Sequence, residues 1–244
     1  MKVFLLAAGK GTRLQPLTFH TPKCLVPICG KPLIEYWFDL FDLYGIDEVL
    51  INTSHLAEKV EDYINNNLSR FKIKLVHEET LLGSGGTIKK NRDFVEGEES
   101  FFIFYADNLT NINLGEMLKF HEENKRDFTL AIFKVPNPRE CGIVELDAEL
   151  SIISFIEKPE NPVSNLAFAG IMLGSPGLMD LFPDRDVFDL GHDVLPRVAG
   201  NAAGYIMDDY LLDIGTPEKL TQAEKDVKNG KIKFSRKLKS GGLI

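Results

Sequence analysis

The chain has 244 residues, of which 44% are hydrophobic, so it can bury one large core and is expected to form one domain, with or without a small appendage. A net charge of −8 argues against a nucleic-acid binder, and no apolar run is long enough to span a membrane. Three cysteines without zinc-like clustering, and a start that does not resemble a signal peptide, predict reduced thiols in a cytoplasmic protein.

Apolar runs of strand length alternate with helical patterns from residue 2 to residue 134. The pattern predicts strands at 2–7, 48–52, 72–77, 101–105 and 128–134, and helices at 32–44, 55–66, 86–94 and 113–124. Such alternation predicts an α/β fold with a largely parallel sheet covered on both faces, in which ligands sit beyond the carboxyl ends of the strands. An aromatic stripe on the first helix, including Tyr36 and Trp37, is expected in the core.

The second half of the sequence has a different pattern. Consecutive strands are predicted at 141–147, 151–157 and 166–173, as a hairpin region that completes the sheet and forms a lid. The elements expected after them are helices at 176–181 and 192–198, short strands near 203–207 and 210–213, and a last helix at 217–228 capped by Thr216. The tail at 229–244 has little to bury, so we expect it to be loosely held or to form a contact in a homo-oligomer.

A turn of small residues follows the first strand. Residues 6–14 read Leu-Ala-Ala-Gly-Lys-Gly-Thr-Arg-Leu, and Thr-Pro-Lys follows at 21–23. Because Gly9 and Gly11 lack Cβ atoms, their backbone N–H groups can approach a phosphate closely. Arg13 adds a permanent planar charge and Lys23 a movable one, so a phosphate site is favoured over a purely structural turn. The spacing matches neither the phosphate-binding loop nor the full dinucleotide fingerprint.

Two aspartates stand at the ends of predicted strands. Asp107 follows the apolar strand at 101–105, and Asp213 ends the strand at 210–213. Each could be a structural cap or a metal ligand. A magnesium ion needs one or two carboxylates, with phosphate oxygens and waters in the remaining positions. Two aspartates at strand ends beside a phosphate turn meet that demand.

Together these motifs resemble the signature of the sugar-1-phosphate nucleotidylyltransferases, which join a nucleoside triphosphate to a sugar 1-phosphate and release pyrophosphate. The resemblance implies a Rossmann-like, glycosyltransferase-A-like fold with a mixed, mostly parallel sheet flanked by helices. It implies one domain over 1–228, with a nucleotide-binding half at 1–135, a sugar-phosphate-binding half at 136–228, and a tail at 229–244. Nucleoside triphosphate, sugar 1-phosphate and Mg²⁺ are the implied ligands, without nucleic acid or membrane.

The resemblance also implies roles for individual residues. Arg13 and Lys23 are expected to be catalytic, and Asp107 and Asp213 to bind Mg²⁺. Residues expected to contact the nucleotide are Leu6, Ala8, Gly9, Gly11, Thr12, Arg13, Glu78, Gly83, Ser84, Gly85 and Asp107. Residues expected to contact the sugar phosphate are Asn108, Gly142, Glu157, Lys158, Asn165 and Gly170. Cys141 and Phe168 stand where the family usually has an aromatic and an asparagine, so the sugar pocket is expected to be roomier and less polar there.

The glycine-rich segment at 82–87 opens a predicted helix, where free N–H groups favour a ligand contact over a merely flexible loop. In the family this segment contacts the base and ribose. Pyrimidine-specific members often carry a glutamine nearby, and this segment has none, while Glu78 lies just upstream. The sequence therefore looks closer to guanylyltransferases acting on mannose or heptose 1-phosphate with GTP. A thymidylyl-, uridylyl- or cytidylyltransferase for another sugar phosphate or phosphocholine, and a non-catalytic nucleotide-sugar sensor, stay as alternatives.

Overall fold

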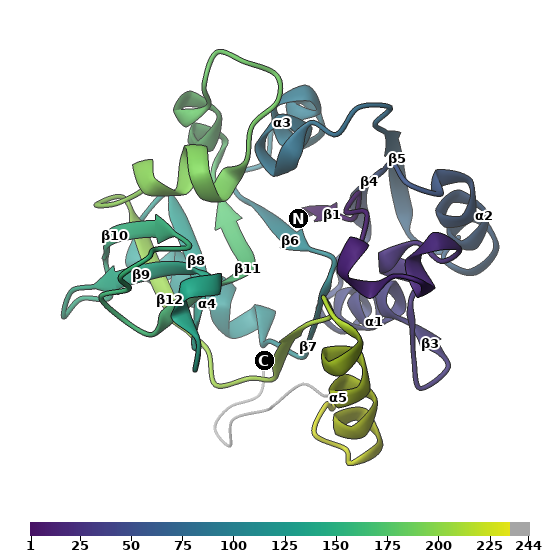
Figure 1. Ribbon diagram of the computed structural model, residues 1–244. Helices are drawn as coiled ribbons and strands as arrows, with labels where there is room; N and C mark the ends of the chain where they lie inside the picture. The colour runs from purple at the N-terminus through teal and green to yellow at the C-terminus, as the bar shows by residue number, and fades with distance from the viewer. Residues whose placement is uncertain (235–244) are drawn as a thin grey trace, which may run out of the picture.

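The computed structural model describes residues 1–234 and has an α/β fold (Figure 1). The large sheet contains β1 Lys2–Leu6, β4 Glu48–Thr53, β5 Lys72–His77, β6 Phe101–Tyr105, β8 Phe128–Lys134, β9 Gly142–Leu146, β10 Ile152–Glu157, β11 Leu166–Gly174 and β12 Ala202–Ile206. Two small sheets pair β2 Pro27–Ile28 with β3 Lys31–Pro32, and β7 Asn108–Thr110 with β13 Leu211–Asp213. The α-helices are α1 Leu33–Tyr44, α2 Ala57–Asn67, α3 Gly83–Lys90, α4 Leu114–Asn124 and α5 Pro217–Lys228.

The large sheet has the strand order β10-β9-β11-β6-β1-β4-β5, with β8 paired to β11 and β12 paired to β8. All of its strands except β10 and β11 run in the same direction. The expected mixed, mostly parallel sheet is therefore confirmed. Strand β11 bends at Gly170, which has a φ of +70°, and it pairs with β9 before the bend and with β6 after it.

Alternating side chains of β1 are buried on opposite faces of the sheet, which is why this strand is apolar throughout. Val3 and Leu5 pack with α1, α2 and α4, whereas Phe4 packs with α3 and the segment 176–198. Tyr36 and Trp37 of α1 are buried, as expected. Helix α5 and the β7–β13 ribbon share a third, smaller cluster of buried side chains.

Several elements differ from the sequence-based prediction. The helix expected at 86–94 is α3, which begins at Gly83 and is followed by a 3-10 turn at Arg92–Val95. The two helices expected at 176–181 and 192–198 are short turns of 3-10 and π type. The ribbon strand β7 and the β2–β3 hairpin were not expected. The strand expected at 210–213 is β13, which pairs with β7. The β9–β10 hairpin extends the sheet as expected, and its role as a lid stays a prediction.

The C-terminal segment corrects one expectation. Thr216 caps α5 as predicted, because its Oγ1 accepts a hydrogen bond from the Lys219 N–H at 3.4 Å. After α5, however, residues 229–234 are not loosely held. The Phe234 ring lies 6.0 Å from the ring of Tyr36 in α1, and the Lys233 carbonyl accepts a hydrogen bond from Asn111 Nδ2 at 3.3 Å. The rest of the predicted tail, 235–244, lies outside the described residues.

Candidate active site

The carboxyl ends of β1, β4 and β6 surround a pocket of about 390 Å³. Of the residues predicted from the sequence, those on its wall are Leu6, Ala8, Gly9, Gly11, Thr12, Arg13, Lys23, Glu78, Gly83, Ser84 and Asp107. Other wall residues, not singled out from the sequence, include Asn52, Leu81, Tyr105 and Asp189. Ligands were expected at this edge of the sheet, and the largest group of predicted site residues does gather there.

The two glycines of the turn after β1 differ in their surroundings. Gly11 has a φ of +63°, and a Cβ there would lie 2.9 Å from Thr18 Cγ2. Thr18 also holds this turn, since its Oγ1 donates a hydrogen bond to the Gly11 carbonyl at 2.8 Å. A Cβ on Gly9 would meet nothing within 4 Å, although Gly9 lines the pocket. Gly11 is therefore required by the fold, whereas Gly9 leaves open space that a ligand can use.

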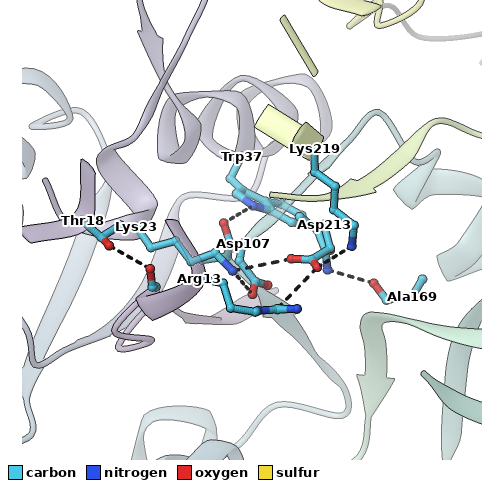
Figure 2. Close-up of polar contacts among 11 residues, drawn as sticks. Arg13, Thr18, Lys23, Trp37, Asp107, Ala169, Asp213 and Lys219 are labelled. Atoms are coloured by element: carbon cyan, nitrogen blue, oxygen red, sulfur yellow. Dashed lines mark hydrogen bonds and ion pairs between the residues drawn. The ribbon is translucent and has the colours of Figure 1, made fainter. Parts of the chain in front are cut away.

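Lys23 lies between the two aspartates at one side of the pocket (Figure 2). Its Nζ is 2.7 Å from Asp107 Oδ2 and 3.5 Å from Asp213 Oδ1. Only 8% of Lys23 is exposed, so its charge depends on these partners. The Arg13 guanidinium approaches Asp213 to 3.9 Å and is largely exposed, as a side chain that must reach a ligand would be.

The β7–β13 ribbon brings the two aspartates together. Asp213 pairs with Asn108 in the ribbon, and the Ile214 N–H donates a hydrogen bond to the Asp107 carbonyl at 2.8 Å. The indole of Trp37 also fixes this region, because its Nε1 donates to the Ala106 carbonyl at 3.2 Å. The expected convergence of Asp107 and Asp213 is thus a property of the fold.

Cations control the ionisation of Asp213. Burial alone would raise the pKa of this carboxyl, but the charge of Lys23, the hydrogen bond and charge of Lys219, and the charge of Arg13 outweigh burial and lower the pKa below its usual value. Asp213 is therefore ionised at neutral pH. This is the state that a metal ligand needs.

The residues present suit a magnesium ion. Within residues 1–234, Asp213 Oδ1 is buried and accepts no hydrogen bond, although the charge of Lys23 lies 3.5 Å away, so this oxygen could coordinate a cation. No group of three or more histidine, cysteine or acidic side chains with metal-binding geometry occurs in the same residues. A site with two carboxylates, completed by phosphate oxygens and water, matches the coordination that Mg²⁺ prefers.

Lys219 belongs to this cluster but was missed by sequence reasoning. It lies in the first turn of α5, and its Nζ donates a hydrogen bond to Asp213 Oδ2 at 2.9 Å (Figure 2). A signal was present, because the helix dipole disfavours cations in a first turn. A lysine in this first turn, six residues after Asp213, could have indicated an ion pair with that aspartate.

Elsewhere on the pocket wall, Glu78 is held in a buried network. Its Oε1 accepts hydrogen bonds from Asn52 Nδ2 at 2.9 Å and from Thr87 Oγ1 at 2.5 Å, and its Oε2 accepts from the Leu82 N–H at 3.0 Å. Asn52 also accepts a hydrogen bond from the Ala7 N–H at 2.7 Å. The amide of Asn52 therefore ties the glycine turn to Glu78.

The glycine-rich segment of α3 is used differently from the prediction. Free N–H groups were expected there, but the Gly85 and Gly86 N–H groups both donate to the Phe188 carbonyl at 3.2 Å. A Cβ on Gly85 would lie 2.2 Å from the Phe188 ring, and Gly85 is not on the pocket wall. Gly85 is therefore a packing position. Gly83 and Ser84 do line the pocket, and Ser84 Oγ donates to Asp189 Oδ2 at 2.8 Å.

The predicted sugar-phosphate residues fall into separate groups, all outside the pocket wall. Glu157 lies between two glycines, since a Cβ on Gly142 or Gly191 would be 2.7 or 2.8 Å from its Oε2. Lys158 is exposed, has a φ of +48°, and places its Nζ 3.6 Å from Glu157 Oε1. Glu157, Lys158 and Gly142 thus form one group.

Three other predicted sugar contacts have structural partners. Asn108 is buried and its Nδ2 donates to the Ala169 carbonyl at 3.1 Å, and a Cβ on Gly170 would lie 2.7 Å from that Nδ2. These two residues join β7 to β11. Asn165 is exposed, and its carbonyl accepts the Val135 N–H at 3.0 Å. Their contacts with a sugar stay predictions.

A family model described as nucleotidyl transferase matches residues 2–230 of this chain. The chain belongs to the nucleotidyl transferase family. The predicted family resemblance is thereby confirmed. Among residues 1–234, none of the helices combines the length and the apolar character needed to cross a bilayer.

Two curated members of the family illustrate its range. The UTP–glucose-1-phosphate uridylyltransferase of Synechocystis sp. is 31% identical over 96% of this chain and 65% of the relative. The mannose-1-phosphate guanylyltransferase of Mycobacterium tuberculosis is 30% identical over 93% of this chain and 64% of the relative. The chain thus spans less than two thirds of the length of these relatives.

Solved structures agree with the fold. HddC from Yersinia pseudotuberculosis, complexed with GMP-PN, has a TM-score of 0.77 at 25% identity and covers 93% of this chain and 99% of its own. A Bacillus anthracis protein in complex with a sucrose has a TM-score of 0.83 at 23% identity, and the match covers 97% of this chain and 98% of that protein's chain. The second likeness concerns the fold alone.

Proposed function

We propose that this member of the nucleotidyl transferase family transfers a nucleotidyl group from a nucleoside triphosphate to a sugar 1-phosphate and releases pyrophosphate. The observation that carries the proposal is the position of Lys23, which is buried between Asp107 and Asp213 beside the Gly9–Gly11 turn. A non-catalytic sensor would not need a buried lysine held by two carboxylates at the phosphate end of its pocket. The named activities of the two curated relatives point to the same reaction class.

In the proposed reaction an oxygen of the sugar 1-phosphate attacks the α-phosphorus, the new P–O bond forms, and the bond to the β-phosphate oxygen breaks as pyrophosphate leaves. The attacking phosphate is already an anion, so no general base is required. Lys23 and Arg13 would stabilise the charge that accumulates on pyrophosphate. Asp107 and Asp213 would hold Mg²⁺, which when bound screens the repulsion between the two phosphate substrates and orients the α-phosphate. Lys158 would hold the attacking phosphate.

GTP is the donor that we favour. Glu78 lines the pocket, and its carboxylate accepts three hydrogen bonds from the protein, whereas a carboxylate offers about four acceptor positions. The remaining position could accept an N–H from guanine, which presents donors at N1 and N2. The GMP-PN complex of HddC, at 25% identity, agrees with this choice. A uridylyl-, thymidylyl- or cytidylyltransferase is the alternative, because the uridylyltransferase relative is 31% identical.

For the acceptor we favour a mannose- or heptose-type 1-phosphate, in line with the guanylyltransferase relative. Glu157 would accept hydrogen bonds from sugar hydroxyls, since its carboxylate is placed against Gly142, where the main chain allows close approach. Action in the cytoplasm and assembly into a homo-oligomer stay predictions.

The test is pyrophosphate release across the common nucleoside triphosphates paired with mannose, glucose and heptose 1-phosphates, with and without Mg²⁺. We expect the highest rate with GTP and a mannose- or heptose-type acceptor, and a rate near background without Mg²⁺ or in Asp213→Asn. A highest rate with UTP, dTTP or CTP would leave the reaction class intact and overturn the choice of base. No product from any pair would favour the sensor.

A further inference from the structure

The charges around Asp213 are unbalanced. Three cations, Lys23, Arg13 and Lys219, lie within ion-pair distance of two carboxylates, Asp107 and Asp213. A magnesium ion would add two more positive charges to a cluster that is already cationic. In the proposed reaction Lys23 and Arg13 stabilise the leaving pyrophosphate of the nucleotide. Lys219 is therefore the cation of this cluster to which no substrate group has been assigned.

Lys219 approaches the Asp213 carboxylate from the side opposite Lys23 (Figure 2). Asp213 also pairs in the β7–β13 ribbon with Asn108, one of the predicted sugar-phosphate contacts. Burial raises the pKa of the Cys141 thiol, and the charge of Lys219 is the largest effect that opposes it, while Glu157 and Asp213 also act on that thiol. Cys141 precedes Gly142, and its carbonyl accepts the Lys158 N–H at 3.0 Å. Lys219 is therefore bonded to Asp213 and close enough to Cys141 for its charge to act on that thiol.

The main chain of Lys219 is anchored, whereas its side chain is partly exposed. The Lys219 N–H is held by the Thr216 cap at 3.4 Å, which anchors the start of α5. The Lys219 side chain is 39% exposed and its Nζ has one hydrogen bond, to Asp213 Oδ2. A lysine in a first helical turn works against the helix dipole, so its presence there is not explained by helix stability.

We propose that Lys219 binds the phosphate of the acceptor sugar 1-phosphate, together with Lys158, and leaves Asp213 when that carboxylate binds the metal ion. This inference rests on the proposed function and deepens it. Lys219 would place the attacking oxygen on the side of the α-phosphate opposite the leaving pyrophosphate, where Lys23 and Arg13 lie. Its contact is with the reacting phosphate, so it counts as a substrate-binding residue of the reaction.

The experiment compares Lys219→Gln and Lys219→Arg with Lys225→Gln, a matched change of an exposed lysine in the last turn of the same helix. Initial rates are measured with GTP and with whichever of mannose and glucose 1-phosphate the wild type uses faster. We expect Lys219→Gln to raise KM for the sugar phosphate by roughly tenfold to a hundredfold, the loss of one hydrogen bond between charged groups. KM for GTP should change less than about twofold. In Lys219→Arg, KM for the sugar phosphate should lie between those of the wild type and Lys219→Gln. Lys225→Gln should match the wild type.

An unchanged KM for the sugar phosphate in Lys219→Gln, or an equal rise of both KM values, would overturn the inference while leaving the proposed function intact. A wild type without product from any substrate pair would instead count against the proposed function. In that event calorimetric titration of mannose 1-phosphate decides about Lys219. Binding that is lost in Lys219→Gln and kept in Lys225→Gln supports the inference, whereas equal binding by both variants, or no binding by the wild type, overturns it.

Discussion

Lys23 is the residue on which the cluster at the pocket depends. A charged group that is 8% exposed needs opposite charges within hydrogen-bond distance, and Asp107 supplies one at 2.7 Å. The same arrangement keeps the ammonium group beside the Gly9–Gly11 turn, where we place the phosphates of the donor. Structure and proposed chemistry thus require the same side chain.

Replacing Lys23 separates these two requirements. We expect Lys23→Ala to lower kcat by about 10²- to 10³-fold, because one preorganised charge on the leaving group is lost. The fold should survive, as circular dichroism and thermal unfolding would verify, with Lys23→Gln as a variant of similar volume. Turnover near that of the wild type in both variants would contradict the assigned role.

Asp213 gives a prediction about acid stability. Its pKa is below the usual value in the folded protein, so its stabilising effect is present above the pKa of the unfolded chain, about 3.9 for aspartate, and is lost as pH falls through the folded value. The free energy of unfolding in urea should therefore differ between wild type and Asp213→Asn more at pH 7 than near pH 3. A difference that is the same at both pH values would show that the ionisation of Asp213 does not contribute.

Among the elements, strands and helices with apolar periodicity could be predicted from the sequence, and those that depend on distant partners could not. β1 and β6 are apolar because both of their faces are covered, and that pattern is local. Strand β7 has three residues and exists because β13 pairs with it from the far end of the chain. The packing of Gly85 against Phe188 could not be predicted from neighbouring residues either, because the two residues are far apart in the sequence. The N–H groups of Gly85 and Gly86, which were expected to be free for a ligand, donate to the Phe188 carbonyl.

Two glycine substitutions test this distinction between packing and binding. A Cβ on Gly86 would lie 2.2 Å from the Asp186 carbonyl oxygen, so Gly86→Ala should lower the free energy of unfolding by about 1–3 kcal/mol. Gly9→Ala meets no neighbour and should leave stability equal or slightly higher. It should instead raise KM for the nucleoside triphosphate several-fold, because its methyl group enters the pocket. Urea unfolding and initial rates of both variants provide the test. A loss of stability in Gly9→Ala, or an unchanged stability in Gly86→Ala, would contradict this distinction.

On the scale of the whole molecule, the C-terminal segment returns to the first helix. Phe234 packs against Tyr36 and the cluster around α5, which links the end of the described chain to α1. The convergence of Asp107 and Asp213 was expected because each ends a strand, but the structure achieves it through the β7–β13 ribbon, which was not expected. Lys219 and Asn52 were not predicted, since their roles arise from contacts made in the folded chain.

The contact of Phe234 predicts a measurable loss of stability. Phe234→Ala should lower the free energy of unfolding by roughly 1–2 kcal/mol through lost burial against Tyr36, as followed by thermal or urea unfolding. Phe19→Ala, at a side chain that is 54% exposed, is the control and should change stability by less than about 0.5 kcal/mol. Equal values for the two variants would mean that the segment after α5 contributes little.

The β7–β13 ribbon has a consequence for how this protein could be divided. A cut in the connection after β8 would leave Asp107 on one fragment and Asp213 on the other. Neither fragment could hold a divalent ion with both carboxylates. Activity would then return only when the fragments reassociate and the two short strands pair again. If the proposed function is correct, a split form of this chain could report by nucleotide-sugar synthesis that its two pieces have met.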